Sequence, residues 1–187
     1  MRMSTIPLEA LLGIGMLPIS STYQAQLKDK IDILSEKYSR EEGKATGALA
    51  LSAQDDIFKH IKLQVLEQIQ PFYTDALRTS ESWCLKYSNG QKLTKHNHIV
   101  DGALLTYSYI IDSGGSDTPL QFYDIRGEKI IKEVSAKTGM IICFSNYINH
   151  GIEIHKGNDR YILAGNLVGA NASDTLLERK KFSTPSD

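Results

Sequence analysis

The first third of the chain carries apolar residues at helical spacing. Leu27, Ile31 and Leu34 recur every three or four residues between Thr22 and Tyr38, which predicts an amphipathic helix over this stretch. Thr22 is a suitable N-cap, because its hydroxyl can accept a hydrogen bond from the first free amides of the helix. This stretch is therefore expected to lay one apolar face on the protein core.

A second helix is predicted further along. Ser52 and Asp55 form a start that resembles a capping box, and Pro71 disfavours regular continuation beyond the end. Its apolar stripe consists of Ile57, Phe58, Ile61, Val65, Leu66 and Ile69.

From about residue 80 the apolar period changes to that of strands. Eight segments are predicted: Ser82–Ser88, Leu93–His98, Ala103–Ile111, Leu120–Asp124, Ile130–Val134, Met140–Phe144, Gly151–His155 and Arg160–Val168. Short strands that follow two helices favour a mainly β fold, closed or double-sheet, backed by the N-terminal helices. We expect a single domain over 1–187, with a helical support region at 1–79, a β core at 80–170 and a C-terminal helix or tail at 171–187.

The N-terminal apolar run from Leu8 to Ile19 is too short to span a bilayer, and Glu9 interrupts it. It lacks the basic start and the cleavage site of a signal peptide. We expect it to form an edge strand or a helical turn over the core. No membrane partner and a cytoplasmic location are the corresponding expectations.

The charge balance and the two cysteines argue against nucleic-acid binding and against a cysteine metal site. The 21 Lys and Arg residues nearly balance the 22 Asp and Glu residues, so nucleic acid is not favoured as a partner. Cys84 and Cys143 match no metal-ligand spacing and lie in apolar strand-like runs. They are expected to be buried thiols in a reducing compartment.

Three of the five histidines fall where a metal site would need them. His96 and His98 are two residues apart in a predicted strand, so their side chains point to the same face. His150 follows the buried-looking strand at 140–144 after a short loop. Two ligands from one strand and a distant third make a facial set, which leaves the opposite positions open for a bidentate cosubstrate and O2.

The surrounding residues resemble a known family. The run from Tyr87 to His98, with Gly90 and Gln91 inside it, is similar to the entry motif of Fe(II)/2-oxoglutarate dioxygenases related to prolyl 4-hydroxylases. That motif reads Tyr-x-x-Gly-Gln, then an aromatic or apolar residue, then His-x-Asp. A second group resembles the distal motif of the family: Gly139, Phe144, His150 and Arg160. The resemblance covers roughly Trp83 to Val168.

One position departs from the family pattern, because His98 stands where the family has aspartate. Small, often phage-related, members that this chain resembles carry His-x-His there. Three neutral imidazoles lack the usual negative charge, so Fe(II) should be held less tightly. Asp101 is the alternative source of a carboxylate, although strand alternation places it on the opposite face from His98.

The resemblance implies a double-stranded β-helix of jelly-roll or cupin type. It implies Fe(II) held by His96, His98 and His150, with 2-oxoglutarate as cosubstrate and O2 as oxidant. The implied reaction is hydroxylation of a protein side chain or a small molecule, with release of succinate and CO2. Arg160 would pair with the far carboxylate of 2-oxoglutarate.

Two tyrosines are implied as helpers in cosubstrate binding. Tyr87 is the first residue of the entry motif, and Tyr109 resembles the family tyrosine that hydrogen-bonds the far carboxylate. Tyr107 shares the face of Tyr109 and is an alternative.

Three other functions stay open. The first is oxidative demethylation of a nucleic acid, which the absence of a basic run with aromatic residues does not favour. The second is a three-histidine metal dioxygenase of cupin type that does not use 2-oxoglutarate. The third is a non-catalytic relative that acts as a binding or structural module.

Overall fold

The computed structural model describes residues 12–42, 51–99 and 103–171. The helices are α1 (Ser21–Glu42) and α2 (Lys59–Ile69), and two short 3-10 turns, η1 (Asp56–Phe58) and η2 (Gln70–Phe72), flank α2. The strands are β1 (Leu12–Met16), β2 (Leu51–Ser52), β3 (Leu77–Tyr87), β4 (Leu93–His96), β5 (Leu105–Asp112), β6 (Pro119–Tyr123), β7 (Ile130–Ser135), β8 (Met140–Ser145), β9 (His150–Ile152) and β10 (Arg160–Gly169).

Two antiparallel sheets face each other. The larger has six strands in the order β1-β8-β5-β10-β3-β2, and the smaller has four in the order β4-β9-β6-β7. One apolar cluster fills the space between them, with Leu85, Ile110, Phe122 and Ile162 among its buried members. Two sheets of alternating strands around one core make the double-stranded β-helix that was predicted.

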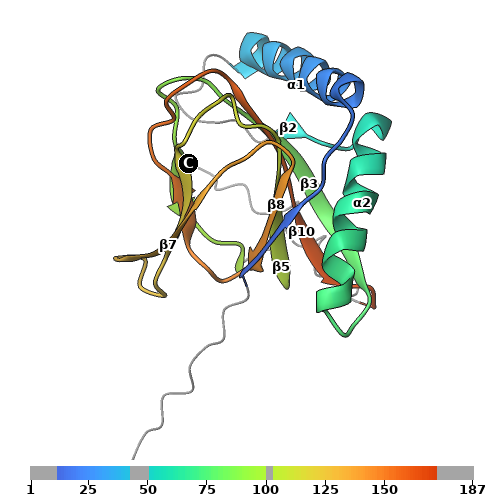
Figure 1. The fold of residues 1–187 in the computed structure, drawn as a ribbon, viewed down its shortest axis with the longest axis vertical. Helices are drawn as coiled ribbons and strands as arrows, with labels where there is room; N and C mark the ends of the chain where they lie inside the picture. Colours follow the sequence, from blue (N-terminus) through green and yellow to red (C-terminus); the bar gives the residue numbers. More distant parts are fainter. Residues whose placement is uncertain (1–11, 43–50, 100–102, 172–187) are drawn as a thin grey trace, which may run out of the picture.

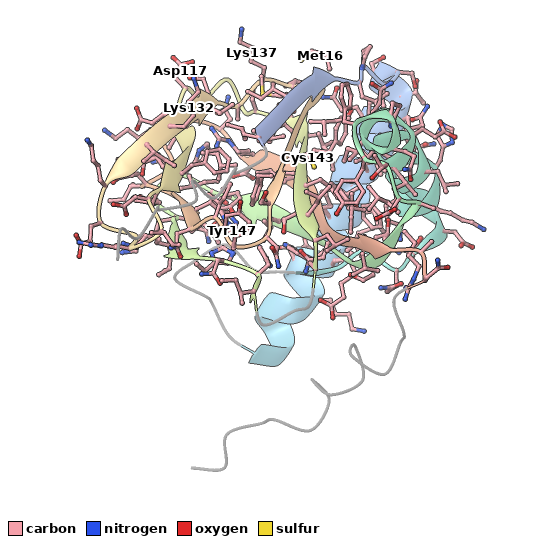
Figure 2. All side chains as sticks on the ribbon, turned by 90° about the horizontal axis from the view of Figure 1, so that it is seen from below. Met16, Asp117, Lys132, Lys137, Cys143 and Tyr147 are labelled. Atoms are coloured by element: carbon pink, nitrogen blue, oxygen red, sulfur yellow. The ribbon has the colours of Figure 1, made fainter. Side chains whose placement is uncertain are left out.

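The helices cover the outer face of the six-stranded sheet (Figure 1). A second apolar cluster joins Leu27 and Ile31 of α1 with Ile61 and Val65 of α2 over this face. Figure 2, turned by 90°, shows the same layers, with Lys132 of β7 on the side away from the helices. The central strands β8, β5 and β10 are therefore buried on both faces, whereas the edge strand β1 is partly exposed and β7 is largely exposed.

Strand alternation decides which residues reach the space between the sheets. In β10, Ile162 and Ala164 belong to the cluster between the sheets, whereas Tyr161 and Leu163 belong to the cluster under the helices. Arg160 has the same parity as Ile162, so it also points between the sheets. Because both faces are buried, the sequence of β10 is apolar throughout its middle.

The predicted helices and eight strands are confirmed, with shifts at their ends. β1 is an edge strand that pairs with β8, so the region at 1–79 is not purely helical. The Ser20 side chain accepts from the Tyr23 amide at 3.2 Å at the start of α1, and Thr22 lies inside the helix. Ser52 belongs to β2 and is no helix cap.

Two predictions concern residues that the structure does not describe. Asp101 and all but the first residue of the C-terminal segment at 171–187 lie outside the described ranges. Within those ranges, no helix has the length and apolar character needed to cross a membrane.

Candidate functional site

The structure brings His96, His98 and His150 together between the two sheets. One nitrogen of each ring lies within 4.8 Å of one nitrogen of each other ring. His96 and His150 face each other in the β4–β9 pairing, and His98 follows two residues beyond the end of β4. A single divalent ion can therefore bind all three imidazoles.

Backbone hydrogen bonds orient two of the rings. The Nδ1 atom of His96 lies 2.8 Å from the Thr94 carbonyl, and Nδ1 of His150 lies 3.1 Å from the Ile148 carbonyl. Since a carbonyl only accepts, Nδ1 carries the proton in each ring and Nε2 keeps its lone pair. This is the arrangement that fixes a histidine as a metal ligand.

Aromatic walls and burial keep the site dry. The Phe144 ring packs 4.6 Å from the His150 ring, and Trp83 stacks on His98 at 5.5 Å. Burial, together with the neighbouring His96, lowers the pKa of His150 to about 3. His150 is therefore a neutral imidazole at physiological pH, which is the form that binds a metal.

The histidines open onto a cavity of about 270 Å³ between the sheets. Apolar side chains make most of its wall, including Leu85, Ile110 and Ile162. The polar groups that reach it, besides the three histidines, are Tyr87, Thr106, Ser108 and Arg160.

Arg160 is the most unusual of these groups, because its side chain is completely buried. Its Nη2 donates to the Thr118 carbonyl at 2.7 Å and to the Ser116 carbonyl at 3.4 Å. Its Nε and Nη1 atoms have no hydrogen-bond partner, and no described carboxylate forms an ion pair with it. A buried cation with free donors is a site for an anionic group.

Tyr87 completes this anion pocket. It pairs with Arg160 in the β3–β10 register, is fully buried, and its hydroxyl has no partner. Burial raises the pKa of Tyr87, so the phenol stays protonated and can donate.

The anion pocket and the histidines lie at different levels of the same cavity. Tyr87 and Trp83 are four residues apart on β3, which corresponds to about 13 Å along a strand. Trp83 stacks on His98, and Tyr87 faces Arg160. The three histidines and Arg160 therefore line the same cavity from different positions along the strands.

Tyr109 is not part of this arrangement. Its hydroxyl donates to the Leu17 carbonyl at 2.9 Å, and its ring packs in the cluster under the helices. Tyr107 lies in the same cluster and bonds to Ser82. The structure instead turns Ser108 and Ile110 of β5 toward the cavity, so it corrects the predicted position of Tyr109.

Comparison with solved structures identifies this fold among oxygenases. A viral collagen prolyl hydroxylase of Paramecium bursaria chlorella virus-1, in complex with 2-oxoglutarate, matches with TM-score 0.62, 11% identity, 86% of this chain and 96% of that chain. A prolyl hydroxylase from Trichoplax adhaerens, in complex with a peptide of hypoxia inducible factor, matches with TM-score 0.63, 12% identity, 92% of this chain and 87% of that one.

A third similar structure is HygX from Streptomyces hygroscopicus with nickel and 2-oxoglutarate bound. It matches with TM-score 0.63 and 9% identity over 87% of this chain and 84% of that chain. No family model matches the sequence, and no curated relative does. The chain thus has the double-stranded β-helix fold of the prolyl hydroxylases and other 2-oxoglutarate-dependent oxygenases.

Proposed function

We propose that this chain is an Fe(II)- and 2-oxoglutarate-dependent oxygenase that hydroxylates a protein side chain or a small molecule. 2-Oxoglutarate and O2 would be consumed, and succinate and CO2 released. The observation that carries the proposal is the buried guanidinium of Arg160, whose free donors lie in the same cavity as three convergent histidines. That pairing matches a ligand with a metal-chelating end and a carboxylate end.

Each group has a distinct task in this proposal. His96, His98 and His150 would hold the metal, which when bound supplies the centre where the keto acid and O2 meet. Arg160 would bind the far carboxylate through two N–H groups, and the Tyr87 hydroxyl would donate a further hydrogen bond. The apolar wall keeps water away from both ends.

The substrate is expected to approach from the side of His96. His96 is half-buried, whereas His98 and His150 are buried, so the ring of His96 lies nearest the solvent. The similar Trichoplax enzyme binds a peptide, which supports a polypeptide substrate as one candidate.

The test needs no substrate. Fe(II) and then 2-oxoglutarate are added anaerobically to the metal-free protein, and the weak visible charge-transfer band of the chelate is recorded. The band should form in the wild type, fail in His98→Ala through loss of metal, and fail in Arg160→Ala through loss of 2-oxoglutarate. Arg126→Ala, an exposed arginine, is the matched control and should keep the band.

One observation favours a second candidate, a three-histidine dioxygenase of cupin type without 2-oxoglutarate. All three clustered ligands are histidines, and no carboxylate joins them among the described residues. If the protein binds iron but 2-oxoglutarate produces no charge-transfer band, the three-histidine dioxygenase is the better explanation. If no metal binds, a non-catalytic binding or structural role replaces both.

A further inference from the structure

The edge strand β4, which carries His96 and leads into His98, has few backbone hydrogen bonds to its neighbour. β4 has four residues, and its pairing with β9 consists of Leu93 with Ile152 and His96 with His150, with an irregularity between them. β4 has no partner on its other side within the described sheet. An edge strand with so few ladder contacts needs other interactions to fix its register.

Two asparagines connect the two ligand-bearing segments directly. Asn97 lies between His96 and His98, and Asn149 immediately precedes His150. The Asn97 Nδ2 atom donates to the Asn149 Oδ1 atom at 3.1 Å. Both side chains are half-buried, so the bond is partly shielded from water.

Backbone hydrogen bonds anchor Asn149 and His98, the residue that follows Asn97. The Asn149 carbonyl accepts from the Tyr123 amide at 2.8 Å, which ties this residue to β6. The His98 amide donates to the Asn146 carbonyl at 2.8 Å. The position of Asn149 is therefore fixed by β6. Its hydrogen bond holds Asn97 in place, and with Asn97 the neighbouring residues His96 and His98.

We propose that Asn97 and Asn149 form a positioning pair that holds His96 and His98 in register with His150. The pair touches neither metal nor substrate; it acts through the histidines. This inference rests on the proposed metal site. Partners that orient metal ligands typically contribute about 10- to 100-fold to metal affinity.

The test measures the dissociation constant of Co(II) alone, without 2-oxoglutarate, by its visible spectrum. Asn97→Ala and Asn149→Ala should each weaken Co(II) binding by about tenfold or more. Because the two residues act as a unit, the double variant should be no more than about twofold weaker than either single variant. Asn89→Ala, in an exposed turn remote from the histidines, is the matched control and should bind as the wild type.

A conservative variant separates the hydrogen bond from a folding defect. Asn149→Asp keeps an acceptor for Asn97 and adds a negative charge beside the site, so it should bind Co(II) at least as tightly as the wild type. Adding Asn97→Ala to Asn149→Asp should then weaken binding about tenfold relative to Asn149→Asp alone. Thermal denaturation of each metal-free variant accompanies the titrations. The fold should persist, because the pairing of His96 with His150 and the bond from Lys95 to the Gly127 carbonyl remain.

The outcomes distinguish the two proposals. If the wild type binds no Co(II), both the proposed metal site and the proposed positioning role of Asn97 and Asn149 are wrong. If the wild type binds and both alanine variants stay within twofold of it, only the positioning pair is wrong. The positioning pair would also be wrong if the loss of Co(II) binding free energy in the double variant equalled the sum of the losses in the two single variants. Such additivity is expected of independent residues and not of a coupled pair.

Discussion

Replacing Arg160 by methionine is expected to stabilise the ligand-free protein. The guanidinium is fully buried, and its Nε and Nη1 atoms have no partners. Each unsatisfied buried donor costs about 1–3 kcal/mol, so the two together cost about 2–6 kcal/mol. Methionine removes this cost, but it leaves the Thr118 carbonyl without its donor, at about 1–3 kcal/mol. The bond to the Ser116 carbonyl is also lost, but at 3.4 Å it is weak and adds little.

At the midpoints of these ranges, about 4 kcal/mol is gained and about 2 kcal/mol is lost, so the free energy of unfolding should rise by about 2 kcal/mol. For a chain of this length each kcal/mol corresponds to about 2–4 °C in Tm. Binding of 2-oxoglutarate should fail in the same variant. Loss of a buried charge pair costs about 2–5 kcal/mol, which weakens binding about 30- to 5,000-fold.

The assay is urea denaturation with Mn(II) present, with and without 2-oxoglutarate. At about 100 times its dissociation constant for the wild type, the ligand should stabilise the wild type by about 2.7 kcal/mol and Arg160→Met by less than about 1 kcal/mol. Arg126→Met is the matched control and should respond to the ligand as the wild type does. The reasoning is refuted if Arg160→Met is less stable than the wild type, or if 2-oxoglutarate still stabilises it fully.

Three further predictions concern one residue of the pocket and two features outside it. Tyr87→Phe should weaken 2-oxoglutarate binding by about 1 kcal/mol, roughly fivefold, in a calorimetric titration; unchanged affinity would exclude its hydroxyl from the pocket. Gly114→Ala should lower the urea midpoint more than Gly115→Ala, because both glycines have positive φ but only the first would place Cβ 2.3 Å from a backbone oxygen. Equal effects would refute the clash. Burial raises the pKa of the Asp159 carboxyl, but the Lys86 ammonium at 3.0 Å outweighs this effect, and the pKa is lowered overall. The ion pair therefore contributes its full stabilisation at pH values above the ordinary carboxyl pKa of 3.8, and this stabilisation is lost as the pH falls below 3.8. In Asp159→Asn, the free energy of unfolding should depend less steeply on pH in that range.

The clustering of the three histidines was predictable because much of its geometry is local. His96 and His98 share a face through simple alternation, and this holds although His98 lies beyond the end of β4. The buried strand at 140–144 and its short loop placed His150 near them. The anion pocket followed from the distance in sequence between His150 and Arg160, together with the family resemblance.

In β5, Thr106 and Ser108 share the face that lines the cavity, whereas Tyr109 lies on the opposite face. The resemblance of Tyr109 to the family tyrosine pointed to the wrong face, although the alternation of polar residues indicated the right one.

Other positions depended on contacts that no local pattern reports. Strand alternation places Trp83 on the same face as Leu85 and Tyr87, but it does not show that Trp83 stacks on His98 at the cavity. The bond between Asn97 and Asn149 joins segments 52 residues apart, and neither amide carries a signal in its own neighbourhood.

The all-histidine composition of the centre has an electrostatic consequence for binding equilibria. Among the described residues that line the cavity, none is acidic. A divalent ion on three neutral imidazoles, together with Arg160, would place three positive charges in a small space of low dielectric. A dicarboxylate cancels only two of them. Small inorganic anions should therefore compete for the metal-loaded protein, and its affinity for dicarboxylates should fall as ionic strength rises.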